Sequence, residues 1–150
     1  MIETAAGPIV FAYDGSELAR LAIEEAGKQL RPGRDALVLT VWQTFNVGFI
    51  PSRELQIDAA KAPDVEFAAE DTAAAGAELA EASGFRATTL AKEAASAWEC
   101  IVDIADDRDA SLIVLGSHGR SGFPGALLGS VAGAVAAHTS RSVLIVHRRT

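Results

Sequence analysis

The sequence predicts an α/β fold in which a parallel sheet is covered by helices on both faces. Short apolar runs, typical of buried strands, alternate along the chain with segments of helical periodicity. These runs are continuously apolar, which is expected of strands that are buried on both faces of a parallel sheet. A strand with one face in water would instead alternate apolar and polar residues.

The composition is that of a soluble globular domain. The 150 residues are 49% hydrophobic and 22% charged, with a net charge of −7. This length predicts a single domain over residues 1–150. The sequence has no cluster of lysines and arginines, so we expect neither a general nucleic-acid binder nor a protein that binds an anionic membrane surface.

The expected location is the cytoplasm. Cys100 is the only cysteine, which excludes an intramolecular disulfide and suits a reducing compartment. The first residues carry an acid and lack the basic and apolar regions of a signal peptide. No uncharged apolar run reaches the roughly 18 residues that a membrane helix requires.

The first part of the chain predicts two strands with a helix between them. The strands are expected at residues 9–13 and 36–42. The helix begins after an Asp-Gly-Ser turn in which Ser16 is the N-cap, and it ends at Pro32-Gly33. Residues 43–62 contain Gly48 and Pro51 and are followed by Pro63, and we expect a loop there, with room for a short helix.

The second part of the chain predicts three strands and three helices. A helix is expected at 64–83, ended by Gly84, with one face formed by Val65, Ala68, Thr72, Gly76 and Leu79. Residues 85–91 are more polar and predict an edge strand. Ser96 can cap a helix that carries Trp98, Ile101, Val102 and Ala105. A strand at 111–115, a short helix at 130–139 and a last strand within 142–147 complete the pattern.

The chemically informative segment is the glycine-rich loop at 116–129, which leaves a buried strand and leads into a helix. Glycine permits positive φ angles and close approach of a ligand to the backbone. The free N–H groups at the start of the following helix favour an anion. A phosphate-sized cradle fits this pattern, and so does a plain strand-to-helix connection that binds nothing.

Familiar phosphate-binding and catalytic motifs do not match this loop. It lacks the lysine of a Walker A motif, and it follows the fourth strand where a dinucleotide-binding fingerprint follows the first. The spacing around Ser121 is not that of a nucleophile elbow.

The loop resembles the ATP-binding branch of the universal stress protein family. Gly116-x2-Gly119-x9-Gly129-Ser130 matches that branch's Gly-2x-Gly-9x-Gly-Ser/Thr motif. Residues 9–16, 111–122 and 142–146 are similar to the family's first strand and turn, its fourth strand and loop, and its last strand. The resemblance extends over nearly the whole chain.

The resemblance implies an open five-stranded parallel sheet, Rossmann-like, with the strand order 3-2-1-4-5. The first and fourth strands are then neighbours whose connections leave in opposite directions, and ligands bind in the crevice at such a point. The family also implies a homodimer through the last strand, Val143–Val146, which is an apolar edge. Arginines near that strand would alternatively shield it in a monomer.

The resemblance assigns roles to ten residues around a bound ATP, with Mg²⁺ arriving on its phosphates. Asp14 would accept hydrogen bonds from the ribose, Val41 would offer its backbone to the adenine, and Ala12 would line the base pocket. The remaining positions would approach the ribose or hold phosphates, namely Gly116, His118, Gly119, Arg120, Gly129, Ser130 and Val131. For Arg120, a solvated loop cation is an equal alternative, and for Asp14 a plain turn acid is a less favoured one.

These observations lead to three functional hypotheses. The first is a nucleotide-responsive regulator of stress response or survival, acting on a protein partner that the sequence does not identify. The second is a slow ATPase or phosphotransferase, for which His118 and Ser121 are the candidate groups. The third is a dimeric interaction module that binds no nucleotide.

Three further features carry weaker predictions. The histidines lack zinc-site spacing, so we expect no structural zinc. The acidic residues Asp103, Asp106, Asp107 and Asp109 lack the pattern of a calcium loop and predict a solvated acidic face. No cation adjoins Cys100 in the sequence, which gives no support for a reactive thiol.

Overall fold

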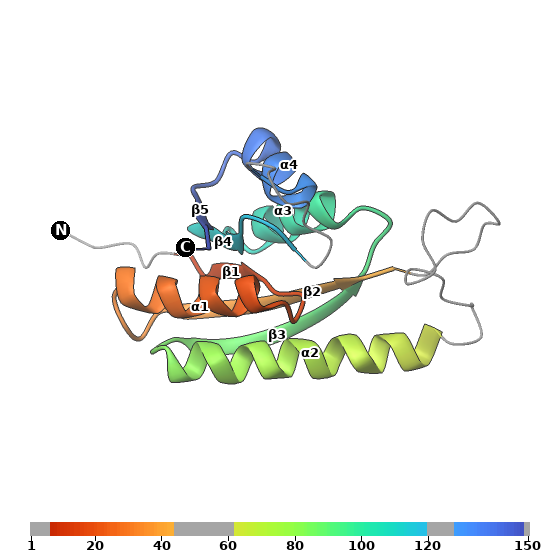
Figure 1. Ribbon diagram of the computed structural model, residues 1–150, viewed down its shortest axis with the longest axis horizontal. Helices are drawn as coiled ribbons and strands as arrows, with labels where there is room; N and C mark the ends of the chain where they lie inside the picture. Colours follow the sequence, from red (N-terminus) through yellow and green to blue (C-terminus); the bar gives the residue numbers. More distant parts are fainter. Residues whose placement is uncertain (1–6, 44–61, 120–127, 149–150) are drawn as a thin grey trace.

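A computed structural model describes residues 7–43, 62–119 and 128–148. Within these residues, strands and helices alternate along the chain (Figure 1). The strands are β1 (Ile9–Ala12), β2 (Asp35–Trp42), β3 (Arg86–Glu93), β4 (Leu112–Gly116) and β5 (Val143–Val146). The helices are α1 (Glu17–Gln29), α2 (Ala62–Ala82), α3 (Ala97–Asp107) and α4 (Ser130–His138).

The five strands form one sheet in the order β3-β2-β1-β4-β5, and every neighbouring pair is parallel. This confirms the predicted fold class and strand order. In the centre of the sheet, Ile9 of β1 lies in register with Ala36 of β2 and with Leu112 of β4. β3 and β5 are the two edges, as predicted for both segments.

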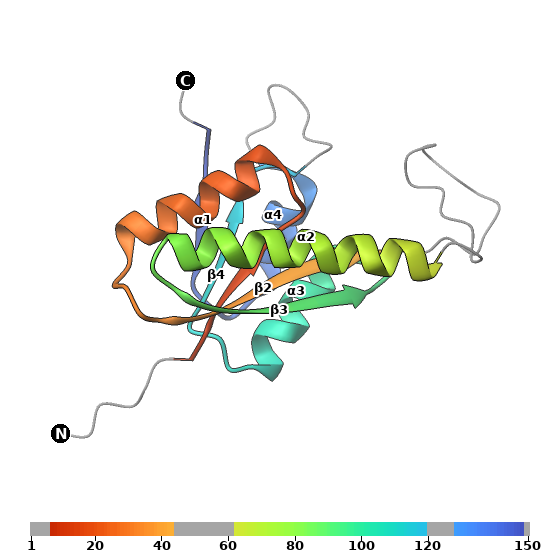
Figure 2. The same cartoon turned by 90° about the horizontal axis from the view of Figure 1, so that it is seen from below.

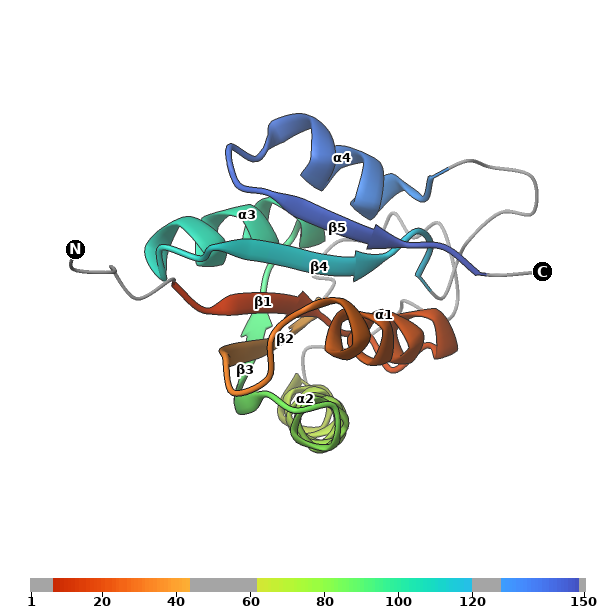
Figure 3. The ribbon, with the colours of Figure 1, turned by 90° about the vertical axis from the view of Figure 1, so that its left-hand side faces the viewer.

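Helices cover the two faces of the sheet in pairs. Helices α3 and α4 lie on one face and α1 and α2 on the other, as two views agree (Figures 1 and 3). Seen from below, α1 and α2 cross in front of the strands (Figure 2). Each face has its own buried cluster, centred on Phe11 and Val38 beneath α1 and α2 and on Val10 and Ile113 beneath α3 and α4.

Local sequence features account for several element ends. The Ser16 hydroxyl accepts a hydrogen bond from the Ala19 N–H at 3.2 Å, which confirms it as the N-cap of α1. Gly84 has φ 101° after α2, where a residue with a Cβ would be strained. Ser96 occupies the N-cap position of α3, as predicted. The prediction that its side chain caps the helix is wrong, because it makes no capping hydrogen bond.

Helix α2 differs from its prediction in the residues that it buries. The buried positions are Ala69, Ala73, Gly76 and Ala80, whereas Ala68 is exposed. Of the predicted face, Gly76 is buried and Leu79 packs against the core, so the prediction is confirmed there and wrong at Ala68. In an alanine-rich helix, neighbouring small residues are nearly equal in hydrophobicity, so the pattern does not distinguish the inner face sharply.

Two other boundaries also differ. β3 extends to Glu93, two residues beyond the predicted end at 91, because each of its residues pairs with β2 as far as Trp42. α2 already includes Ala62. The rest of the loop predicted at 43–62 lies outside the described residues, apart from Gln43.

The four acidic residues near the end of α3 are exposed, as predicted, and two of them also form ion pairs. The Arg141 side chain forms ion pairs with Asp106 at 3.0 Å and with Asp109 at 2.8 Å. It also donates to the Ala110 carbonyl at 3.0 Å. Arg141 thus ties the segment before β5 to the connection between α3 and β4, and two of the four acids have a structural role.

No helix in the described part of the chain combines the length and the apolar character needed to cross a membrane.

Candidate functional site

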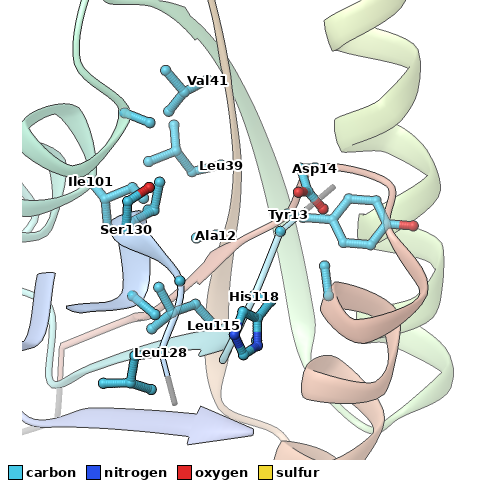
Figure 4. A pocket seen from close by; sticks show the side chains of 17 residues that line it. Ala12, Tyr13, Asp14, Leu39, Val41, Ile101, Leu115, His118, Leu128 and Ser130 are labelled. Carbon is cyan, nitrogen blue, oxygen red and sulfur yellow. The ribbon is translucent and has the colours of Figure 1, made fainter. Parts of the chain in front are cut away.

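A cavity of about 340 Å³ lies at the carboxyl ends of β1, β2 and β4, within the usual size range of small-molecule sites. It is at the point where the strand order reverses, the expected ligand position in an open α/β sheet. Figure 4 shows the side chains of Asp14 and Ser130 on opposite sides of it, with Leu39 and Val41 along β2. We call this cavity the crevice pocket.

The crevice pocket brings together nine of the ten predicted site residues. These are Ala12, Asp14, Val41, Gly116, His118, Gly119, Gly129, Ser130 and Val131. The tenth, Arg120, lies outside the described residues, as does Ser121 of the ATPase hypothesis.

Asp14 is held in place by the turn between β1 and α1. Its Oδ1 accepts a hydrogen bond from the Ser16 N–H at 2.9 Å. Gly15 has φ 82°, which lets the chain reverse between the strand and the helix. The Tyr13 ring points away from the pocket, toward the helices of the other face (Figure 4). The hydrogen bond from Ser16 and the turn at Gly15 thus fix the position of the Asp14 carboxylate at the pocket.

The inner part of the crevice pocket is apolar. Side chains of Leu39, Ile101 and Leu115 line it, together with Ala97 and Val131 from the starts of α3 and α4. A flat apolar ring would bury its faces in such a slot. Polar recognition at this end must then come mainly from backbone groups.

The backbone of Val41 is directed toward the pocket side of β2. The Leu39 carbonyl accepts from the Tyr13 N–H at 2.9 Å, so the backbone groups of Leu39 face β1. Backbone groups two residues apart along a strand face the same side. Those of Val41 therefore face the space just beyond Ala12, the last residue of β1.

The start of α4 forms the opposite wall. The Gly129 N–H donates to the Ser117 carbonyl at 2.7 Å, which fixes the start of the helix against the end of β4. The N–H groups of the first helical turn have no partner within a helix, and the helix dipole places partial positive charge there. Gly129 provides no side-chain cap, and Ser130 is exposed. This end of the pocket suits an anion.

The described glycines of the motif are required because a side chain would not fit, and not because of positive φ angles, which were also predicted. Within the described residues, the glycines with positive φ are Gly15, Gly33 and Gly84, none of them in this loop. A Cβ at position 119 would lie 2.9 Å from Asp14 Oδ2. At position 129 it would lie 3.1 Å from the Ser117 carbonyl oxygen. Side chains there would crowd the carboxylate and the start of α4.

His118 lies on the wall of the pocket near Leu115 (Figure 4). Its Nδ1 is 3.1 Å from the buried hydroxyl of Ser117. Its Nε2 is also buried and has no hydrogen-bond partner within the described chain. The ring is thus oriented by its neighbour and retains one unused polar atom.

The charges around the pocket are few. Among its described lining residues, Asp14 is the only carboxylate, and none is lysine or arginine. The described residues also contain no group of three or more histidine, cysteine, aspartate or glutamate side chains that could hold a metal ion. Any cation at this site would therefore depend mainly on the ligand for its coordination.

Sequence reasoning missed the apolar walls of the pocket. Leu39, Ala97, Ile101, Leu115 and Leu128 contribute to it and were treated as core or not considered. Position in the elements could have identified them, because they lie at strand carboxyl ends, near helix starts or beside the glycine motif.

A second cavity lies beside α3, with Lys92, Cys100 and Asp103 among its lining residues. Burial raises the pKa of the Cys100 thiol, and the smaller effects of Lys92 and Asp103 oppose each other. A raised pKa favours the protonated thiol, so the structure, like the sequence, gives no support for a reactive Cys100.

Comparison with known proteins identifies the family. The universal stress protein family model matches residues 6–147. A universal stress protein of Mycolicibacterium smegmatis is 31% identical over 143 residues, which are 95% of this chain and 46% of that protein. The chain thus spans about half the length of this relative.

Solved structures share the fold. The hypothetical protein MJ0577 superposes with a TM-score of 0.78 at 23% identity, covering 98% of this chain and 99% of that one. A universal stress protein in complex with cAMP gives a TM-score of 0.59 at 26% identity, covering 96% and 98% of the two chains. Together with the family match over nearly its whole length, this shows that the chain belongs to the universal stress protein family.

Proposed function

We propose that this protein binds ATP in the crevice pocket and acts as a nucleotide-responsive regulator. The observation that carries the proposal is the arrangement of three features around one cavity. An apolar slot lies between a carboxylate, Asp14, and the uncapped start of α4. ATP carries a matching set of features, with an apolar ring in its base, hydroxyl donors on its ribose and negative charge on its phosphates.

The adenine occupies the apolar slot in this proposal. Ala12 and Ile101 leave room for the ring, and the backbone N–H and carbonyl of Val41 pair with its polar edge. The related structure with cAMP supports the choice of base, because cAMP has the same adenine and ribose. The slot has no charged side chain among its described residues, which suits a neutral base.

The ribose and phosphates lie between Asp14 and α4. The Asp14 carboxylate accepts hydrogen bonds from the ribose hydroxyls. The phosphates accept hydrogen bonds from the N–H groups of Ser130 and Val131 and from the Ser130 hydroxyl. The Gly129 N–H was also predicted to hold phosphate, but it donates to the Ser117 carbonyl. Gly116 and Gly119 leave the space for this approach, which is the physical content of the Gly-2x-Gly-9x-Gly-Ser motif.

Charge balance gives Mg²⁺ a role in this proposal. The chain carries a net charge of −7, and the described pocket lining contains no lysine or arginine. Mg²⁺ then binds chiefly to the phosphate oxygens and water, which it prefers to retain. His118 and Arg120 are the remaining candidates for phosphate contacts, and the buried Nε2 of His118 would need the ring to turn before it could reach one.

The regulator works as a cytoplasmic homodimer in this proposal. β5 is an edge of the sheet and its four residues are all apolar. Such an edge pairs readily with a second copy. A structural effect of nucleotide binding at the ends of β1 and β4 is then transmitted to the dimer edge through β4, which pairs directly with β5.

Calorimetric titration with ATP and with 2′,3′-dideoxy-ATP tests the assignment. Wild-type protein should bind ATP more tightly, by about tenfold for hydrogen bonds from the ribose to a charged acceptor. Asp14→Asn should reduce this preference, because the amide is a weaker acceptor. The matched control Asp64→Asn, on the exposed start of α2, should retain it. Failure of the wild type to bind ATP would contradict the proposal and favour an interaction module.

A further inference from the structure

A buried threonine hydroxyl lies where β1 separates from β2. Thr40 and Tyr13 are only 6% and 8% exposed. The Thr40 hydroxyl donates a hydrogen bond to the Tyr13 carbonyl at 2.8 Å. Because a buried carbonyl needs a donor, this bond satisfies the last backbone acceptor before Asp14. The Thr40 side chain itself lies outside the crevice pocket.

The hydroxyl takes the place of a sheet hydrogen bond. The Tyr13 N–H continues the parallel ladder by donating to the Leu39 carbonyl at 2.9 Å. The next bond of a regular parallel ladder would run from the Val41 N–H to the Tyr13 carbonyl. No backbone hydrogen bond joins these two described residues. The Val41 N–H is therefore not consumed by β1.

We infer that Thr40 is a positioning residue for the nucleotide, an inference that rests on the proposed function. By satisfying the Tyr13 carbonyl from the side, its hydroxyl ends the β1–β2 ladder and leaves the Val41 N–H to the base. The same bond anchors the backbone that carries Asp14 to the ribose. One side chain behind the pocket thus sets both the base contact and the ribose contact.

Substituting the hydroxyl tests this directly. Thr40→Val has nearly the same shape but no donor, so the Val41 N–H becomes the remaining donor for the Tyr13 carbonyl. We expect ATP affinity to fall about tenfold, as for loss of one or two hydrogen bonds. Thr40→Ser keeps the hydroxyl and should bind ATP nearly as the wild type does. Thr88→Val is the matched control, because the Thr88 hydroxyl meets the Ala36 carbonyl at 3.5 Å on another strand, away from the pocket.

Amide hydrogen exchange gives a readout that a purely structural role would not change. In nucleotide-free wild type, the Val41 amide should exchange faster than the Leu39 amide of the paired ladder and become protected when ATP is added. In Thr40→Val it should already be protected without ATP. Either of two results would overturn this inference alone. One is equal ATP affinity of Thr40→Val and wild type. The other is a Val41 amide that, in nucleotide-free wild type, is as protected from exchange as the Leu39 amide. Wild type that binds no ATP would overturn the proposed function and this inference together.

Discussion

At the residue scale, the pocket requires the missing side chain of Gly119 as well as the side chains that line it. Position 119 has no Cβ, and one placed there would lie 2.9 Å from Asp14 Oδ2. The Asp14 carboxylate is in turn oriented by the Ser16 N–H. A side chain at 119 must therefore displace the group that we assign to the ribose. The position of Asp14 therefore depends both on glycine at 119 and on the turn that follows β1.

The Cys100 thiol predicts a pH dependence of stability. Burial raises its pKa above the ordinary value of 9.0, so above about pH 9 the unfolded chain releases a proton that the folded protein retains. Proton release from the unfolded state alone lowers stability as pH rises, until the raised folded pKa is reached. Wild type should therefore lose stability relative to Cys100→Ala between pH 8 and pH 10. Urea unfolding at both values measures this, and parallel losses in the two proteins would contradict it.

The family resemblance predicted much of the candidate site. It implied roles for Asp14, Gly119 and Ser130, and the structure brings these residues to one pocket. The sequence predicted that the glycines allow close approach and positive φ angles, and within the described residues the structure supports only the first. The φ angles could not be predicted because they are a property of the folded loop. The role of Thr40 was not predicted at all, since a threonine in an apolar strand is typical of β structure.

At the scale of elements, α2 packs on the sheet through residues without large side chains. A Cβ at Gly76 would lie 2.7 Å from Tyr13 Cδ2 and 2.8 Å from Val38 Cγ1. Neighbouring contacts come from Ala73 and Ala80, which are fully buried. The helix therefore approaches β1 and β2 closely, and it supports the Tyr13 ring from behind the pocket.

Gly76→Ala should consequently destabilise the protein by about 1–2 kcal/mol. Overpacking typically costs about 1–3 kcal/mol, and the better helix propensity of alanine offsets part of it. Gly133→Ala in α4 is the matched control, because the nearest atom to its added Cβ would be 4.0 Å away. That variant should gain about 0.5–1 kcal/mol. Denaturant unfolding compares the two, and a stabilised Gly76→Ala protein would contradict the packing described here.

Elements were predicted more reliably than their faces and ends. Continuous apolar runs identified the central strands, because these are buried on both sides. The inner face of α2 was wrong at Ala68 because alanine occupies both its exposed and its buried positions. The interaction of Arg141 with Asp106 and Asp109 joins residues far apart in the sequence, and such pairs follow only from the fold.

At the scale of the whole molecule, the sheet has one edge suited to a second copy. The Ser142 carbonyl accepts from the Ile113 N–H of β4, and the Val146 carbonyl accepts from the Ser117 N–H. By alternation, the backbone groups of Val143 and Ile145 face away from β4. These outward groups are the ones that a second β5 would pair with in the proposed homodimer.

Val143→Pro should therefore convert the dimer to a monomer. Proline removes an outward N–H without affecting the ladder to β4, and it is tolerated at the first residue of an edge strand. Light scattering should give roughly twice the chain mass of 15.6 kDa for wild type and that mass for the variant. Circular dichroism should show the same fold in both. A monomeric wild type, or a folded variant that stays dimeric, would contradict an interface through β5.

The most direct test of ATP binding in the crevice pocket is thermal unfolding with and without Mg-ATP, with Mg-GTP as the control. ATP at about a hundredfold over its Kd should add about 2.7 kcal/mol, a shift of several degrees for a chain of this size. Gly119→Val should abolish the shift, because its side chain would occupy the space beside Asp14. Nucleotide-free protein that shows no shift with ATP, or an equal shift with GTP, would contradict the account.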